Sequence, residues 1–232
     1  MLNKSTQKRV VFFTDSLGFP REFESDESRI NYEETYIAKI KDTFSDTFEI
    51  IQQSYIGLDT EEAKYIAKFS LYPLRPDYVI FHHGVNDCAP RLFKKDSVVL
   101  KIIKIFDKPL GGLLQKIVNK LSRHFSSPKR TYVDINNFEK NLSEIKASLI
   151  NLNSGVKLIA ISVSKKPCAI EYKRPGYNNN IEKYNLILKK YSDFFIDLDS
   201  LEDHLIHDGI HLNSIGHDFI NSRLEDILKC VE

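Results

Sequence analysis

Short apolar runs alternate with stretches of helical hydrophobic spacing along most of this 232-residue chain. Buried strands are predicted where β-branched and aromatic residues concentrate, at residues 9–14, 48–52, 78–82, 156–163 and 194–198. Helices are predicted between and after them, at residues 31–42, from residue 60 onward, and at 134–149, 180–191 and 213–229. We expect Thr60 to cap the second of these helices. Strands that alternate with helices form a parallel sheet covered on both faces.

Composition narrows the class of protein further. A hydrophobic fraction of 42% allows a sizeable core, and the length suits one domain over residues 1–232. The net charge of +1 does not suggest a nucleic-acid-binding protein, and no apolar run approaches the ~18 residues of a membrane-spanning helix. The apolar run at 10–13 is too short for the core of a signal peptide, so we expect a cytoplasmic protein. Three cysteines without paired spacing do not suggest a disulfide framework or a zinc ribbon: Cys88, Cys168 and Cys230.

Residues 91–130 depart from the alternation and predict a basic helical insertion. The segment holds eight lysines and three arginines against Asp96 and Asp107, a net charge of +9. Its apolar residues from Leu110 to Phe125 recur at helical spacing, which predicts one amphipathic stripe. Two interpretations stay open. The insertion is either a helical hairpin packed on the domain, or a cap or surface that meets an anionic substrate or partner.

Three polar segments follow predicted strands or precede the last helix. They are Asp15-Ser16-Leu17-Gly18, then His83-Gly84-Val85-Asn86-Asp87, and finally Asp208-Gly209-Ile210-His211. The carboxyl ends of parallel strands line one crevice, where ligands bind, so we expect these distant segments to converge there.

The residues of these segments suit acyl transfer, which needs a nucleophile, a base, a group that orients the base, and oxyanion donors. Ser16 can be the nucleophile and His211 the base, with Asp208 three residues earlier to orient the imidazole. Asn86 can offer its side-chain amide to the oxyanion. Gly57 can offer a backbone N–H, because it has no Cβ to block a close approach.

The three segments, in this order, resemble the motifs of the SGNH (GDSL) hydrolase family. The nucleophile block is matched by Asp15-Ser16-Leu17, the Gly-x-Asn-Asp block by Gly84-Val85-Asn86-Asp87, and the Asp-x-x-His block by Asp208-Gly209-Ile210-His211. Asn213 and Gly216-His217 also resemble the ending of that family. The chain departs from the pattern at Thr14, where the family has glycine, and in the second block, which is reduced to Gly57.

The resemblance implies a flavodoxin-like three-layer α/β/α sandwich with a five-stranded parallel sheet. It also implies the catalytic residues Ser16, Asp208 and His211. The oxyanion hole would be formed by the backbone N–H groups of Ser16 and Gly57 and by the side chain of Asn86. Asp15, Gly84 and Asp87 would support these loops.

Other residues near the segments have competing interpretations. The density of His204, His207, Asp208, His211 and His217 raises a metal site, but no His-Glu-x-x-His pattern is present, and we expect neither a metal nor a cofactor. His82 and His83 end a buried strand, where a structural role is expected. Cys88 follows Asp87 and could line the pocket. The loop around Pro175-Gly176, with Tyr172, Lys173, Arg174 and Tyr177, either floors the substrate pocket or is solvated.

The predicted activity is hydrolysis of a carboxylic ester through an acyl-enzyme, with a small-molecule or glycan ester as substrate and an O-acetyl group as one candidate. An acyltransferase with the same triad is the alternative, since it differs only in the acceptor that the pocket holds. A catalytically silent binding module is the third hypothesis, against which the intact set of Ser16, Asn86, Asp208 and His211 counts.

Overall fold

A five-stranded parallel sheet forms the centre of the computed structural model, which describes residues 7–22, 28–93, 95, 97–98 and 127–230. The strands lie in the order β2-β1-β3-β4-β5, and each neighbouring pair is parallel. Their bounds are β1 (Lys8–Thr14), β2 (Phe48–Ser54), β3 (Tyr78–His82), β4 (Lys157–Ile161) and β5 (Phe194–Ile196). All five coincide with apolar runs of the sequence.

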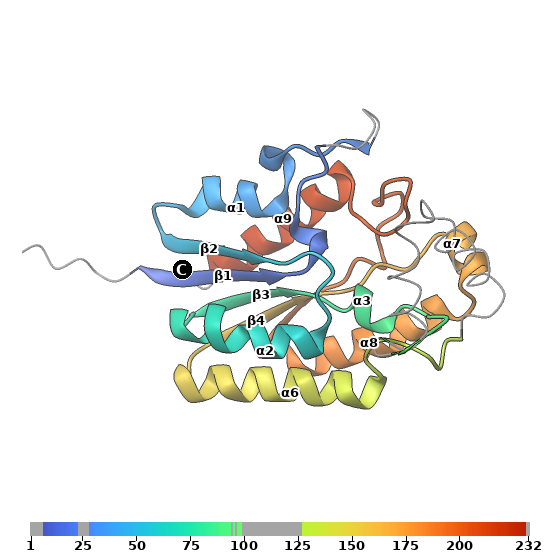
Figure 1. Cartoon of the computed structure of the whole chain (residues 1–232). Coiled ribbons are helices and arrows are strands. Elements are labelled where there is room, and N and C mark those ends of the chain that lie inside the picture. The colour runs from blue at the N-terminus through green and yellow to red at the C-terminus, as the bar shows by residue number, and fades with distance from the viewer. Residues whose placement is uncertain (1–6, 23–27, 94, 96, 99–126, 231–232) are drawn as a thin grey trace, which may run out of the picture.

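Helices cover both faces of the sheet (Figure 1). One face carries α1 (Tyr36–Phe44) and α9 (Ser214–Cys230), which contact each other. The other face carries α2 (Thr60–Ser70), α6 (Ile135–Leu152) and α8 (Tyr177–Tyr191). Two short helices, α3 (Val85–Cys88) and α7 (Cys168–Lys173), and the 3-10 turns η1 (Ser16–Gly18), η3 (Tyr32–Glu34) and η4 (Tyr72–Leu74) complete the described elements. The predicted three-layer α/β/α sandwich is confirmed.

Alternating strand residues divide the hydrophobic core into two halves. In β1, Val10 and Phe12 pack toward α1 and α9, while Val11 and Phe13 pack toward α2, α6 and α8. All four side chains are fully buried, as expected for a strand covered on both faces. The central strands β1 and β3 therefore have no free face, whereas the edge strand β2 is only partly buried and carries Glu49, Gln52 and Gln53.

Several element boundaries differ from the sequence prediction. The helix predicted at 31–42 begins at Tyr36, because Thr35 has extended backbone angles and its hydroxyl accepts the N–H of Ala38 at 3.2 Å. The helix predicted at 180–191 begins three residues earlier, at Tyr177, after the left-handed Gly176 (φ +82°). The strands predicted at 156–163 and 194–198 are both shorter.

The predicted cap of α2 is wrong by one residue. Asp59, not Thr60, is the capping residue, since its carboxylate accepts the N–H of Glu62 at 3.0 Å and the Glu62 side chain returns a contact to the Asp59 N–H. Thr60 is the first helical residue, and its N–H and hydroxyl are engaged by Asp87 instead.

The predicted insertion lies mostly outside the described residues, because 94, 96 and 99–126 are not among them. The helical hairpin and its amphipathic stripe therefore stay predictions, as does the single-domain assignment. The ends of the segment are described: Arg91 and Ser127 form an antiparallel bridge, and the Arg91 N–H donates to the Arg130 carbonyl at 2.8 Å. The segment thus leaves and rejoins the domain at one place, directly after α3. Among the described residues, no helix is long and apolar enough to cross a membrane.

Candidate active site

Ser16 lies at the turn that follows β1. The backbone passes from Thr14 into the 3-10 turn Ser16–Gly18, and the Asp15 carboxylate caps this turn by accepting the N–H of Leu17 at 2.9 Å. Gly18 is required by close packing, since a Cβ there would lie 2.4 Å from the hydroxyl oxygen of Thr14. The turn leaves Ser16 partly exposed while its neighbours Asp15 and Leu17 are buried.

Hydrogen bonds connect the side chain of Ser16 to that of His211, and that of His211 to Asp208. Ser16 Oγ lies 3.1 Å from His211 Nε2, and His211 Nδ1 lies 2.6 Å from Asp208 Oδ2. The second Asp208 oxygen accepts the backbone N–H groups of Ile210 at 2.7 Å and His211 at 2.9 Å. The structure thus brings together three of the predicted site residues, although Ser16 and His211 are 195 positions apart in the chain.

The charge of Asp208 fixes the proton on the imidazole. Partial burial alone would raise the pKa of Asp208, but its hydrogen bonds from the His211 ring and from two backbone N–H groups outweigh burial and lower the pKa to about 2. An ionised carboxylate can only accept, so Nδ1 of His211 carries a hydrogen when the ring is neutral. Nε2 is then a free base that faces the hydroxyl of Ser16, which is the geometry of an activated serine.

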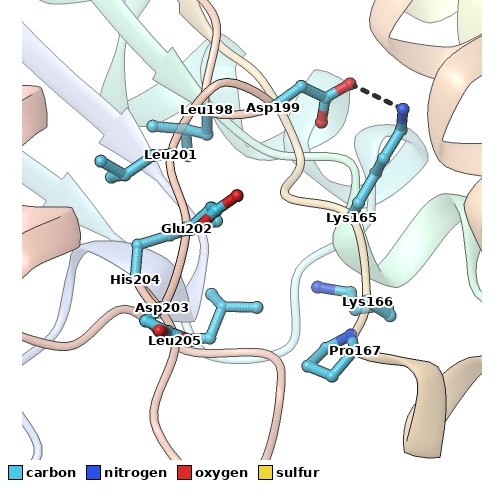
Figure 2. Close-up of a pocket in the computed structure, with 10 residues that line it drawn as sticks. All are labelled: Lys165, Lys166, Pro167, Leu198, Asp199, Leu201, Glu202, Asp203, His204 and Leu205. Carbon is cyan, nitrogen blue, oxygen red and sulfur yellow. Dashed lines mark ion pairs between the residues drawn. The ribbon is translucent and has the colours of Figure 1, made fainter.

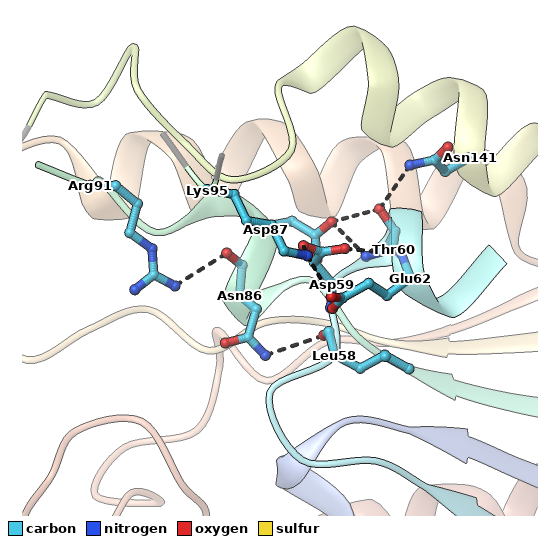
Figure 3. Close-up of polar contacts among 9 residues, drawn as sticks. All are labelled: Leu58, Asp59, Thr60, Glu62, Asn86, Asp87, Arg91, Lys95 and Asn141. Atoms are coloured by element: carbon cyan, nitrogen blue, oxygen red, sulfur yellow. Dashed lines mark hydrogen bonds and ion pairs between the residues drawn. The ribbon is translucent and has the colours of Figure 1, made fainter. Parts of the chain in front are cut away.

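Asn86 lies on α3, directly after β3, with its side chain partly exposed (Figure 3). Gly84 permits this turn because its φ is +124° and a Cβ there would lie 3.0 Å from a methyl group of Val163. The Asn86 amide donates one hydrogen to the Leu58 carbonyl at 3.2 Å. An amide NH2 has two hydrogens, so the second stays available to an oxyanion.

Gly57 lies in the turn between β2 and α2 and is exposed. Its left-handed φ of +73° accounts for glycine at this position, and a Cβ would meet nothing within 4 Å. The contact that ties this turn to Asn86 comes from the carbonyl of the next residue, Leu58. The assignment of the Gly57 N–H to the oxyanion hole stays a prediction.

Asp87 joins the loop of Asn86 to the start of α2 (Figure 3). One of its oxygens accepts both the N–H of Thr60 at 2.9 Å and the hydroxyl of Thr60 at 2.5 Å, and Asn141 donates to that hydroxyl at 3.3 Å. Burial raises the pKa of Asp87 to about 7 in spite of these hydrogen bonds. Asp15 is also fully buried, and its pKa rises to about 8. Both carboxyl groups are fully buried, and their hydrogen bonds brace the loops.

Three other histidines of the region, His82, His83 and His217, are held in the protein interior, whereas His207 is exposed. The Nδ1 of His82 lies 3.0 Å from the Tyr36 hydroxyl, and the ring of His217 stacks on Tyr36 at 5.5 Å between centroids. Burial lowers the pKa of His83 and of His217 to about 3, so both rings are neutral at pH 7. Among the residues that the structure describes, no three His, Cys, Asp or Glu side chains converge as a set of metal ligands.

Cys88 does not line an accessible pocket. Its side chain is fully buried in the core beneath α8, and burial raises the pKa of its thiol to about 12. A thiol in that state is neither exposed nor ionised enough to act as a nucleophile.

A cationic residue that the sequence analysis did not single out lies beside this site. Lys166 follows β4, and its residue is only 4% exposed. Burial lowers the pKa of its ammonium to about 8, partly countered by neighbouring acidic groups, of which Asp208 is ionised. It lines a cavity of about 350 Å³ between residues 165–167 and residues 198–205 (Figure 2). The pair Lys165-Lys166 after an apolar strand was the available signal, since it lies at the same sheet edge as the other polar segments.

The fold was then compared with known proteins. No family model and no curated protein matches the sequence. Solved structures do match. A lipase/acylhydrolase from Enterococcus faecalis superposes with a TM-score of 0.62 at 15% identity, covering 96% of both chains. A GDSL-like lipase from Parabacteroides merdae gives a TM-score of 0.59 at 12% identity over 94% of each chain. The chain has the SGNH (GDSL) hydrolase fold. An acetyl xylan esterase is also similar, with a TM-score of 0.56 at 17% identity, covering 94% of this chain and 98% of that one.

Within the SGNH fold, the predicted site residues divide into two groups. Ser16, His211 and Asp208 contact one another directly. Asn86 is connected to the loop of Gly57 through the Leu58 carbonyl, and its neighbours Gly84 and Asp87 shape and anchor its helix. These identities are below 25%, so the comparisons establish the fold and leave the chemistry to the residues.

Proposed function

We propose that this protein is a serine esterase or acylhydrolase that cleaves a carboxylic ester through an acyl-enzyme. The observation that carries the proposal is the continuous chain Ser16–His211–Asp208, with distances of 3.1 Å and 2.6 Å. Esterases and acylhydrolases of the same fold, at 12–17% identity, are consistent with it.

In the proposed reaction, Ser16 Oγ attacks the ester carbonyl carbon and its proton passes to His211 Nε2. The negative charge that develops on the carbonyl oxygen is stabilised by the second N–H of Asn86 and by the backbone N–H groups of Ser16 and Gly57. His211 then donates its proton to the departing alkoxide, which leaves an acyl group on Ser16. Water attacks this acyl-enzyme with His211 again as the base, and the carboxylic acid is released. Asp208 stabilises the imidazolium in both halves of the reaction.

The structure offers a matched control for this assignment. Ser28 Oγ lies 2.8 Å from His207 Nδ1, so the chain contains a second serine–histidine contact. That histidine has no carboxylate partner among the described residues, and Ser28 is buried. Comparing variants of Ser28 and Ser16 therefore separates a simple serine–histidine contact from a serine–histidine–aspartate triad.

Ser16→Ala should reduce the hydrolysis of 4-nitrophenyl acetate by several orders of magnitude, because the nucleophile is lost. Ser28→Ala should keep most of the activity, and both variants should retain the Tm of the parent. Activity retained in Ser16→Ala would refute the nucleophile. If the acyltransferase alternative holds instead, the parent should form the acyl-enzyme and release acid only slowly. Adding an alcohol or sugar acceptor should then speed up turnover, with the acyl group recovered as an ester of the acceptor.

A further inference from the structure

Arg91 lies shortly after α3, the helix that contains Asn86. Two contacts hold the guanidinium of Arg91 in a fixed position. The group lies over the ring of Tyr132 at 4.0 Å from the centroid, and one of its N–H groups donates to the Asn86 carbonyl at 3.3 Å (Figure 3). Its Nε is buried and has no acceptor among the described residues. Arg91 therefore retains an unused donor close to Asn86, the residue that we assign to the oxyanion.

Arg174 adds a second cation on the neighbouring segment. Its carbonyl accepts the N–H of Tyr177 at 3.2 Å, and burial and then the charge of Arg91 lower the pKa of its guanidinium. The chain around Arg174 is tied to α3, because the hydroxyl of the nearby Tyr177 donates to the Val85 carbonyl at 3.2 Å. The segment around Pro175-Gly176, for which a pocket floor and a solvated loop were the two alternatives, thus packs on α3, the helix of Asn86. Within it, Tyr177 is buried and Tyr172 is 86% exposed.

Lys166 is the third cation of the group and lies near the ring of the same Tyr177. Its ammonium lies 5.7 Å from the centroid of the Tyr177 ring, and in Figure 2 it points into the cavity. Among the residues that the structure describes, none of these three cations forms an ion pair with a carboxylate. The acidic side chains of this cavity, Asp199, Glu202 and Asp203, belong to its opposite wall, and Asp199 pairs with Lys165 at 3.4 Å.

Lys166 has the Asp208 carboxylate nearby, whereas Arg91 and Arg174 have no ion-pair partner among the described residues and repel each other. A bound anion offsets that repulsion. A guanidinium group held in place can also donate two parallel hydrogen bonds, in a bidentate arrangement, to two oxygens of a carboxylate or phosphate. The buried carboxyl nearest to Ser16, that of Asp15, is largely protonated at pH 7 and adds little negative charge.

We infer that Arg91, with Arg174 and Lys166 in support, forms a subsite for an anionic group of the substrate, so that the preferred ester carries a carboxylate or phosphate near the scissile bond. This inference rests on the proposed function and names the substrate class of the same site. Arg91 is here a specificity residue, because it binds the substrate at a distance from the reacting atoms.

The test compares esters that differ in charge and little in size. On the alcohol side, 4-acetoxybenzoate is paired with the neutral 4-acetoxybenzamide. On the acyl side, the 4-nitrophenyl monoester of glutaric acid is paired with 4-nitrophenyl pentanoate. The parent should prefer the anionic member of at least one pair. In Arg91→Gln the ratio of kcat/KM, anionic over neutral, should fall by about tenfold to a hundredfold, the strength of a charged hydrogen bond.

The ratio separates recognition of charge from support of the fold. An Arg91 that only positions Asn86 would lower both members of a pair equally and leave the ratio unchanged. Arg223→Gln is the matched control, since Arg223 also lies over an aromatic ring, that of Phe219, but on α9. It should leave the ratio unaltered. Arg174→Gln should lower the ratio as well. It provides the same test if Arg91→Gln does not fold.

A parent without preference in either pair, or a ratio unaffected in both arginine variants, overturns the inference while the esterase assignment stands. If no ester is hydrolysed at all, the proposed function fails, and the subsite is tested by binding alone. Inorganic phosphate, at ionic strength matched with sodium chloride, should then raise the Tm of the parent more than that of Arg91→Gln. Equal shifts overturn the subsite in that case too.

Discussion

Two buried carboxyl groups stand next to the residues to which we assign chemistry. Asp15 precedes Ser16 and Asp87 follows Asn86, and neither is accessible to solvent. Burial is the main cause that raises the pKa of Asp15 to about 8, and the charge of Asp87 adds to it. The backbone N–H of Leu17 is the hydrogen-bond partner of Asp15, so its role is to hold the turn of Ser16.

The raised pKa makes a prediction about stability and pH. An unfolded Asp15 titrates near pH ~3.9, whereas the folded one keeps its proton up to about pH 8. Asp15 therefore contributes its full stabilisation at pH values below the pKa of the unfolded state. This contribution is lost as the pH rises from there to the pKa of the folded state, about 8. Relative to Asp15→Asn, the parent should lose about 1.4 kcal/mol of unfolding free energy per pH unit between roughly pH 5 and 8.

Urea unfolding at four pH values in that window measures this difference directly. Asparagine keeps the oxygen that accepts the N–H of Leu17, so the comparison isolates the titration. Asp42→Asn, which removes an exposed carboxyl from α1, should show no such trend. A difference between parent and Asp15→Asn that does not change with pH would contradict the assignment of a protonated Asp15.

At the scale of elements, the position of the triad depends on one tight loop. Gly209 lies between Asp208 and Ile210 with a left-handed φ of +65°. A Cβ there would lie 2.8 Å from Ile170 of α7 and 3.2 Å from Pro167. The short helix α7 therefore packs directly on the loop that holds Asp208 and His211.

Gly209→Ala should lower the free energy of unfolding by about 1–3 kcal/mol, from left-handed strain and from the clash with Ile170. It should also lower kcat toward esters by up to ~10²-fold, because a shift of about 1 Å in the loop misplaces His211. Gly155→Ala is the control. Gly155 has no positive φ, and its nearest neighbour would lie at an ordinary 3.5 Å. Equal effects of the two substitutions, in stability and in kcat, would contradict this account of the loop.

The elements themselves were largely predictable from periodicity, and their ends were not. Each of the five predicted strands is observed, and in the central strands burial on both faces demands continuous hydrophobic residues. The start of α1 was missed, since the extended Thr35 interrupts a stretch whose hydrophobic spacing continues through it. The cap of α2 was misassigned because Asp59 and Thr60 are both good capping residues, and only the contact with Asp87 decides between them.

At the scale of the whole molecule, the parallel sheet explains why distant segments meet. The loops after β1 and β3 and the loop before α9 all lie at the carboxyl edge of the strands, so order along the chain was enough to predict that Ser16, Asn86 and His211 gather there. Arg91 was not predicted, because its position depends on Tyr132 and on Asn86, contacts that no local pattern encodes. Lys166 was missed although a signal was available, since Lys165-Lys166 follows an apolar strand at the same sheet edge.

The account rests most heavily on Ser16 as the nucleophile, and one measurement addresses it directly. A fluorophosphonate probe forms a bond from phosphorus to the serine oxygen and releases fluoride, so the adduct marks the activated serine. Tryptic cleavage after Arg9 and Arg21 places Ser16 and Ser28 on different peptides, which mass spectrometry separates. We expect the adduct on the peptide of residues 10–21, and its loss in Ser16→Ala. An adduct on the peptide that contains Ser28, or none on the folded parent, would contradict the account.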